Sequence, residues 1–212
     1  VRAELSMKNL ARPTQFAIFA CLIATAGCVR DAEDYTTSAF ATAVASGSSS
    51  AQIVGSTLTH KIIGSDVNSD GDGYAYEIGV DGGEGFVARA GLLPGTRVPT
   101  LPTSGSATLT GTYEAARVAG IDLDNGRLID FARKASGAIT LEADFAGNTL
   151  SGRSDNDLLK VNGTFDDENL TGTVTYRDIP GALRGKIGGT EAIGIFHGKT
   201  SSSLMAGGFM VK

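Results

Sequence analysis

The sequence predicts an all-β protein: an eight-stranded antiparallel up-and-down β-barrel with a small β-rich N-terminal extension. Three observations lead to this fold class. Gly makes up 29 of the 212 residues, about twice the ordinary share of ~7%, and shows none of the three-residue period of collagen. Apolar and polar residues alternate in many short runs, as half-buried antiparallel strands require. The turns between these runs are short and evenly spaced, which favours strands that pair with their neighbours in sequence.

The first residues have the anatomy of a secretory signal, with a basic segment at 7–12 and an apolar stretch at 16–26. The apolar stretch is too short to cross a bilayer as a helix. It ends in Thr25-Ala26-Gly27-Cys28, which resembles the lipobox of bacterial lipoproteins. The resemblance implies that residues 1–28 are a lipoprotein signal peptide, that Met7 is the start, and that Cys28 carries the lipid, with palmitate as one of its acyl chains. A plain secretory signal followed by a chance cysteine is the alternative.

The residue after the lipobox indicates the expected location, and the overall charge excludes one class of partner. Val29 stands where an Asp would hold an enteric lipoprotein at the inner membrane, so the resemblance implies a lipid anchor in the outer membrane. Whether the protein faces the exterior or the periplasm stays open. The net charge of −5 and the pI near 5.0 argue against nucleic acid as a partner, because binding to it needs a concentrated basic surface.

Three segments are expected after the signal peptide. Residues 29–51 are small and polar and predict a flexible tether. Residues 52–91 contain short β-like runs and predict a β-rich N-terminal segment. Three of the five prolines fall between residues 94 and 102, which marks a boundary, since Pro is excluded from central strands. Residues 92–212 are then expected to form the barrel.

Eight strands are expected in that second half. Leu159, Val161 and Phe165 alternate with polar residues, and the other runs repeat this pattern. The spacing Phe-x4-Leu-(Ser/Thr)-Gly occurs at Phe145 and again at Phe165, which predicts successive hairpins of equal length. A meander of eight strands removes its edges by closing on itself. Its interior has room only for side chains or one small ligand.

The last strands carry the most specific pattern of the chain. Gly194-Ile-Phe196-His-Gly198 is followed by Gly207-Gly208-Phe209. This order resembles the closing strands of the β-barrel domain of transferrin-binding protein B, and the segment from Leu101 to Tyr113 resembles the entry to its first strand. The resemblance covers residues 92–212 and implies a bacterial surface lipoprotein with a reduced handle domain. The transferrin-binding loops of that family have no counterpart in this sequence, so it transfers no binding residue.

One motif has the spacing of a calcium loop. Asp66, Asn68, Asp70, Asp72 and Glu77 fit the pattern D-x-[DN]-x-[DN]-G-x5-E, which would offer Ca²⁺ the oxygen ligands it prefers. The flanks are β-like and lack the helical period of an EF-hand. A simple Asn/Asp/Gly hairpin turn explains the same residues and is the favoured interpretation; no other cofactor is indicated.

The sequence offers no catalytic constellation, so we expect a protein that is not an enzyme. Loss of the signal removes Cys21 and lipidation blocks Cys28, which leaves no thiol. His60 and His197 are the only histidines, too few for an ordinary zinc site or a triad. His197 is expected on the solvent side of its strand; ligation of haem iron by it is the less favoured alternative.

Three functions fit these expectations. The first is an outer-membrane, lipid-anchored binding protein that engages a protein or an iron- or haem-related partner through barrel loops. The alternative is a lipocalin-like carrier of a small apolar ligand in the barrel lumen. A membrane-spanning barrel is the third, disfavoured because the sequence lacks the aromatic girdles of such proteins.

Overall fold

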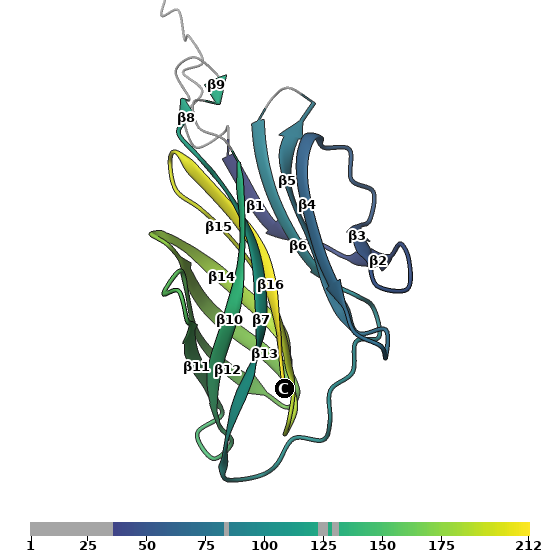
Figure 1. Ribbon diagram of the computed structural model, residues 1–212, viewed down its shortest axis with the longest axis vertical. Helices are drawn as coiled ribbons and strands as arrows, with labels where there is room; N and C mark the ends of the chain where they lie inside the picture. Colours follow the sequence, from purple (N-terminus) through teal and green to yellow (C-terminus); the bar gives the residue numbers. More distant parts are fainter. Residues whose placement is uncertain (1–35, 83–84, 123–126, 129–131) are drawn as a thin grey trace, which may run out of the picture.

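Eight antiparallel strands of the second half close into a barrel in the computed structural model, which describes residues 36–82, 85–122, 127–128 and 132–212 (Figure 1). The barrel strands are β7 (Ser106–Ala119), β10 (Arg133–Asp144), β11 (Thr149–Ser154), β12 (Leu159–Asp166), β13 (Asn169–Tyr176), β14 (Ile179–Ile187), β15 (Ala192–Lys199) and β16 (Ser203–Val211). Each pairs with the next in sequence, and β16 returns to β7. A small pair, β8 (Ile121–Asp122) and β9 (Arg127–Leu128), lies between β7 and β10 in the chain. The predicted fold class is confirmed.

The barrel interior is filled by side chains because the predicted alternation sends one apolar row of each strand inward. In β12, Leu159 and Val161 are buried and Lys160 between them is exposed. The inward rows of all eight strands form one continuous cluster. Its largest members are Tyr113, Phe145, Phe165, Tyr176, Phe196 and Phe209. A barrel of this strand number has an interior just wide enough for such side chains.

Glycines make room for two of these aromatic rings. Gly194 pairs with Phe209 across β15 and β16, and Phe196 pairs with Gly207 in the same ladder. A Cβ at Gly194 would collide with the Phe209 ring, and one at Gly207 would collide with the Phe196 ring. The glycine excess of the sequence therefore has a packing role at these positions.

The N-terminal segment forms a four-stranded sheet in the order β1-β6-β5-β4. Its strands are β1 (Thr36–Phe40), β4 (Thr59–Val67), β5 (Gly73–Asp81) and β6 (Gly85–Leu92), and a separate hairpin consists of β2 (Ala43–Ala45) and β3 (Ala51–Ile53). β1 pairs with β6 in parallel. The predicted tether of residues 29–51 is therefore wrong from Thr36 onward, because residues 36–40 and 43–45 form strands in which Thr36 and Ala43 are buried.

The sheet packs against the outer face of the barrel over β15, β16 and the second half of β7 (Figure 1). Tyr74, Tyr76 and Ile78 of β5 contact Ile193 and Ile195 of β15 in one buried cluster. Strands β15 and β16 are consequently buried on both faces and lose the alternation seen in β12. No helix long and apolar enough to span a membrane occurs among the residues that the structure describes.

Candidate functional site

Of the predicted calcium ligands, Asn68, Asp70 and Asp72 lie in the turn of the β4–β5 hairpin, and Asp66 lies at the end of β4. The side-chain oxygen Oδ1 of Asn68 accepts hydrogen bonds from the backbone N–H groups of Asp70 and Asp72, both at 2.9 Å. Asp72 in turn accepts one from the backbone N–H of Arg97 at 2.8 Å. These oxygens hold the turn together by hydrogen bonds to the backbone, as Asn and Asp commonly do in turns.

Glu77 lies away from that turn, within β5, where it pairs with Ile63 of β4. Its side chain is buried, and Ser56 donates a hydrogen bond to Oε2 at 2.6 Å. Arg89 Nη1 lies 3.6 Å from Oε1 and balances the buried charge. The five predicted ligands are therefore not brought together. Within the described ranges, no group of three or more His, Cys, Asp or Glu side chains is placed to hold a metal ion.

The other two predicted positions have different outcomes. Cys28 lies outside the described residues, so its lipidation stays a prediction. His197 points outward from β15, as expected, but Phe40 of β1 covers it, with ring centroids 4.3 Å apart. The Arg184 guanidinium lies over the other ring of this pair, 4.5 Å from the Phe40 centroid. Burial and the nearby charge of Arg184 lower the pKa of His197 to about 4.

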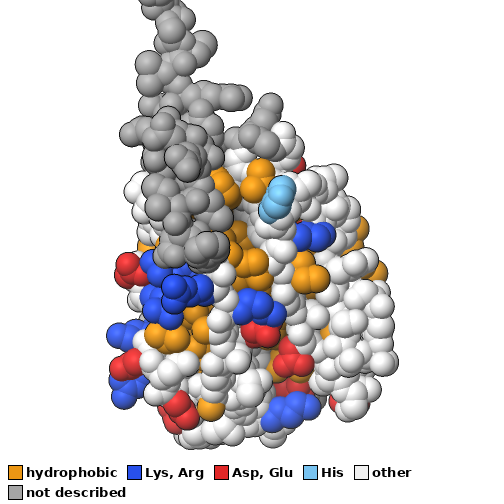
Figure 2. Space-filling model, turned by 45° about the horizontal axis from the view of Figure 1, so that its top comes forward, with side chains coloured by type: hydrophobic (Ala, Val, Ile, Leu, Met, Phe, Trp, Pro, Cys, Tyr) orange, Lys and Arg blue, Asp and Glu red, His pale blue; other side chains and the backbone are white. Residues whose placement is uncertain are grey.

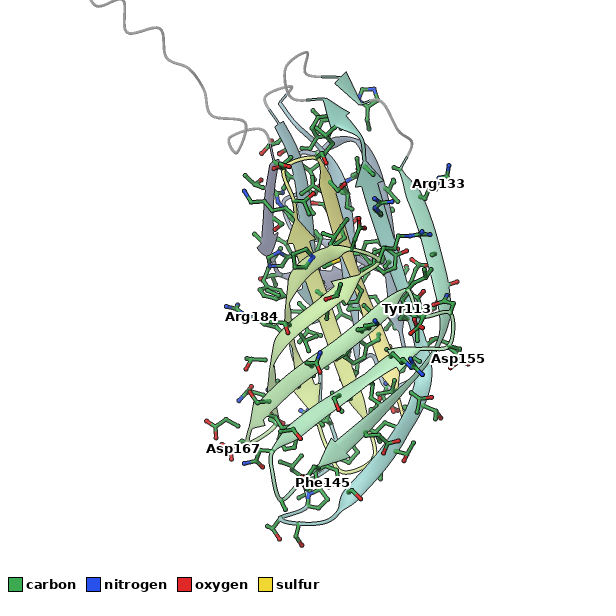
Figure 3. All side chains as sticks on the ribbon, turned by 90° about the vertical axis from the view of Figure 1, so that its left-hand side faces the viewer. Tyr113, Arg133, Phe145, Asp155, Asp167 and Arg184 are labelled. Atoms are coloured by element: carbon green, nitrogen blue, oxygen red, sulfur yellow. The ribbon has the colours of Figure 1, made fainter. Side chains whose placement is uncertain are left out.

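The hairpin turns place the remaining polar groups at the two ends of the barrel. We call the end of the barrel where β1 begins the tether end. The hydrogen bond that Lys199 Nζ donates to the Thr36 carbonyl at 3.0 Å places the beginning of β1 beside the end of β15. The β13–β14 and β15–β16 turns lie there. The distal end carries the β10–β11, β12–β13 and β14–β15 turns. Figure 3 shows Arg133 toward the tether end and Phe145 and Asp167 at the opposite end.

The distal end is closed by the segment that links the sheet to the barrel. Leu101 of this segment packs against the barrel cluster, and Thr100 accepts a hydrogen bond from the Gly189 backbone at 3.3 Å. An open groove of about 640 Å³ remains between the linker and the turns. It is lined by residues 98–103, Phe145, Asn148 and the carboxylates Asp166, Asp167 and Glu168. This groove is acidic, with Lys186 bound to Glu168 at 2.5 Å.

The described residues of the tether end form a basic surface. A hollow of about 450 Å³ is lined by Arg117, Arg133, Lys134 and Arg177, together with Ala119, Ala135 and Tyr176. Figure 2, in which the tether end is turned toward the viewer, shows Lys and Arg side chains gathered on this part of the surface. We call this hollow the basic mouth.

Tyr176 lines the basic mouth, and Tyr113 packs against it from the barrel interior. Tyr113 and Tyr176 pack edge to face, with centroids 6.4 Å apart. The Asn156 amide donates a hydrogen bond to the Tyr113 hydroxyl at 2.9 Å. Burial raises the pKa of Tyr176, and the positive charges of Arg177 and Arg117 oppose part of that rise. Tyr176, Arg117 and Arg177 thus lie together in the lining of the basic mouth.

Sequence reasoning missed the basic mouth. Arg117 lies in the inward row that begins with Leu109 and continues through Tyr113 and Ala115. A cation at the end of an apolar row was a usable signal. The contribution of Arg133 and Arg177 depends on strand register and turn position, which the sequence does not reveal.

No family model matches the sequence, and no curated protein matches it. Among solved structures, the chain is similar to transferrin-binding protein B of Haemophilus parasuis, at 16% identity and a TM-score of 0.44, over 77% of this chain and 38% of that one. The same protein of Actinobacillus pleuropneumoniae gives 15% identity and a TM-score of 0.47, over 77% of this chain and 91% of that one.

A third similar structure is HpuA of Kingella denitrificans in complex with human haemoglobin. It gives 15% identity and a TM-score of 0.40, over 66% of this chain and 54% of that one. The chain spans about two fifths of the H. parasuis protein and of an intact two-lobed transferrin-binding protein B. The chain is thus structurally similar to β-barrel domains of surface lipoproteins, the resemblance expected from the sequence. The similarity concerns the arrangement of strands and carries nothing about partners.

Proposed function

We propose that the protein is a non-catalytic, lipid-anchored binding protein of the outer membrane that engages a protein, or an iron- or haem-related partner, through barrel loops. The observation that carries this proposal is the filled barrel. Because the inward side chains of the eight strands pack in one continuous cluster, binding is left to the outside of the barrel and to its ends.

The filled interior also bears on the carrier alternative. A lumenal ligand would have to displace rings such as Phe196 and Phe209, both fully buried, and displacing well-packed core groups is costly. We expect solvent extraction of the purified protein to release no stoichiometric apolar ligand. A ligand recovered at one equivalent per chain would favour the carrier.

The distal groove is the part of the surface that we assign to the partner. It lies at the end opposite to where β1 begins, and therefore away from an anchor at Cys28. Its exposed carboxylates, Asp166, Asp167 and Glu168, favour a partner with a basic surface, because complementary charges steer association. Asn148, exposed in the same groove, adds an amide group that can bond to a partner, and the buried Phe145 lies at the base of the groove.

Affinity capture with matched variants tests this assignment. The full chain with Cys28→Ser, which prevents lipidation, is immobilised and exposed to host or environmental fluid, and bound proteins are identified by mass spectrometry. We expect the double variant Asp166→Lys/Asp167→Lys to lose the captured partner. Asp155→Lys, an exposed carboxylate outside this groove, is the control and keeps it. Loss in both variants, or in neither, contradicts the distal groove.

The anchor itself is tested in cells. Labelled palmitate is expected in the wild-type protein and absent from the Cys28→Ser variant. Protease added to whole cells then distinguishes surface display from a periplasmic orientation, since only a surface protein is degraded. Equal labelling of both proteins would contradict lipidation at Cys28.

A further inference from the structure

The basic mouth brings together arginines from separate elements of the barrel, and the described residues around them offer few carboxylates. Arg117 of β7 and Arg133 of β10 are direct cross-strand partners in the antiparallel ladder. Direct partners share a face of the sheet, and their row continues the inward pairs Tyr113–Gly137 and Leu109–Leu141. Like charges at directly opposite positions destabilise a strand pair, so this register carries a cost that another group must offset.

The described residues supply little counter-charge. Asp178 lies 3.8 Å from Arg117, but its side chain is 82% exposed, and exposed ion pairs of this kind are weak. The Arg117 Nε is buried and has no hydrogen-bond partner among the residues that the structure describes. Among the residues that the structure describes, the lining of the mouth therefore holds more hydrogen-bond donors than acceptors.

Arg177 adds a third guanidinium at a position that the backbone makes unfavourable. It begins the β13–β14 turn with φ at 56°, a left-handed conformation in which Gly, Asn or Asp is usual and a long side chain is uncommon. Arg thus occupies this position although the positive φ disfavours it, and its side chain lines the hollow beside Tyr176.

We propose that the basic mouth is a binding site for a phosphate-type oxyanion, held by Arg117, Arg133 and Arg177. Planar guanidinium groups donate paired hydrogen bonds to tetrahedral oxyanions, and three of them from separate elements suit the several oxygens of a phosphate group. The hollow of about 450 Å³ is larger than one phosphate ion needs, and its size is that of small-molecule sites. The ligand is therefore a larger molecule that carries a phosphate group.

The position of the chain favours a lipid headgroup as the source of that phosphate. The Ile121 backbone bonds to Ser202 at 3.1 Å and Lys199 to Thr36 at 3.0 Å, so the mouth and the beginning of β1 share one end. Thr36 is the eighth residue after Cys28, which allows a reach of at most roughly 30 Å when this link is fully extended. With the proposed lipid on Cys28, the mouth faces the phosphates of the membrane surface. A free phosphate-bearing molecule is the other source of the same chemistry.

Calorimetry with inorganic pyrophosphate tests the site without its natural ligand. The full chain with Cys28→Ser is titrated at 0.15 M salt, and we expect saturable binding at one site per chain. Arg117→Gln and Arg133→Gln should each weaken it at least tenfold. Arg153→Gln is the matched control, because Arg153 is an exposed arginine that does not line the basic mouth; it should leave binding unchanged. Arg133 is itself exposed, so its variant reports on binding even where Arg117→Gln perturbs folding.

Three results would overturn the site. The first is the absence of saturable heat at millimolar pyrophosphate. The second is equal weakening of binding by Arg153→Gln, which would indicate diffuse electrostatic attraction; the third concerns the chain's own carboxylates. The segment between β7 and β10 also carries Asp124 and Asp130 in the sequence. Binding that appears only after both are changed to Asn would show that the chain's own carboxylates neutralise the arginines.

Vesicle sedimentation separates the two sources. Vesicles of phosphatidylcholine with phosphatidic acid are compared with vesicles that carry phosphatidylserine at the same charge density. Retention on the phosphatidic acid vesicles, abolished by Arg133→Gln and competed by pyrophosphate, supports the headgroup. Pyrophosphate binding without vesicle binding supports the site and overturns the lipid as its source.

Discussion

The two ends of the barrel are built from the same hairpins but differ in what occupies them. At the distal end, Phe145 and Phe165 pack with ring centroids 6.2 Å apart, and Leu101 covers the barrel cluster from outside. At the tether end, Arg117 of β7 lies directly opposite Arg133 of the adjacent strand β10, next to the Tyr113–Tyr176 pair. Apolar contacts thus close the distal end, whereas basic side chains surround a hollow among the described residues of the tether end.

The difference indicates that the two ends contribute unequally to stability. Burial of apolar area is the dominant favourable contribution to folding, and the distal end has more of it. A cross-strand pair of arginines opposes folding by itself, so its presence is better explained by binding than by stability. Substitutions at the distal end should therefore lower the free energy of unfolding, and substitutions in the basic mouth should alter binding instead.

The largest effect is expected from Phe165→Ala at the distal end. Phe165 is 5% exposed and contacts Phe145, and removal of a buried Phe ring costs about 3–5 kcal/mol. Urea unfolding followed by circular dichroism measures the change, with Arg133→Gln as the partner variant from the tether end. We expect the latter to change the unfolding free energy by less than about 0.5 kcal/mol. Equal losses in both variants would remove the contrast between the ends.

The sequence was sufficient for the barrel because its strands are half-buried. Alternation such as that of Leu159, Lys160 and Val161 gives the strand, its inward face and its boundary together. It was not sufficient for the N-terminal sheet. The runs Ala192–Phe196 and Leu204–Phe209 are buried on both faces. Their continuous apolarity indicates that another part of the chain packs on the outer face, but it does not indicate which part.

Leu101→Ala should have the second-largest effect. Leu101 is half-buried and packs against the distal end of the barrel cluster from the linker, so we expect a loss of about 1–2 kcal/mol, below that of a fully buried Leu. The linker should also loosen, which amide hydrogen exchange at Gly189 would detect through its bond to Thr100. If the variant exchanged faster at Ile121, at the tether end, but not at Gly189, Leu101 would not be holding the linker against the distal end.

Acid should weaken the joint that holds β1 to the barrel on its tether side. Because the folded pKa of His197 is about 4 and the unfolded value is near 6.5, the unfolded chain binds the proton first as the pH falls. Stability is therefore unaffected above pH 6.5, decreases between pH 6.5 and 4, and changes no further below that. Since the ring is half-buried, we discount the effect for solvent screening to about 1 kcal/mol.

The variant His197→Gln isolates this contribution from the carboxylates that titrate in the same range. The difference in unfolding free energy between wild type and variant should change with pH only between 6.5 and 4. Arg184, whose charge also lowers the His197 pKa, is unchanged in both proteins. A difference that is constant with pH would show that the pKa of His197 is the same in the folded and the unfolded protein, and that its packing against Phe40 does not lower it.

A small effect on stability, of the opposite sign, is expected from Arg177→Gly. A left-handed backbone costs a non-Gly residue roughly 1 kcal/mol, and Gly returns part of this through greater freedom of the unfolded chain. We expect a net gain of about 0.5 kcal/mol in urea unfolding, together with weaker pyrophosphate binding.

Asp157→Gly is the matched control for that variant. Asp157 has a similar φ of 57° in the β11–β12 turn, and its side chain does not line the basic mouth. Because Asp tolerates the left-handed region better than Arg does, its gain should be smaller, and pyrophosphate binding should be unchanged. If Arg177→Gly instead destabilised the protein and left binding intact, Arg177 would be a packing residue of the turn. The unfavourable backbone at Arg177 would then have no functional cause, and the basic mouth would rest on Arg117 and Arg133 alone.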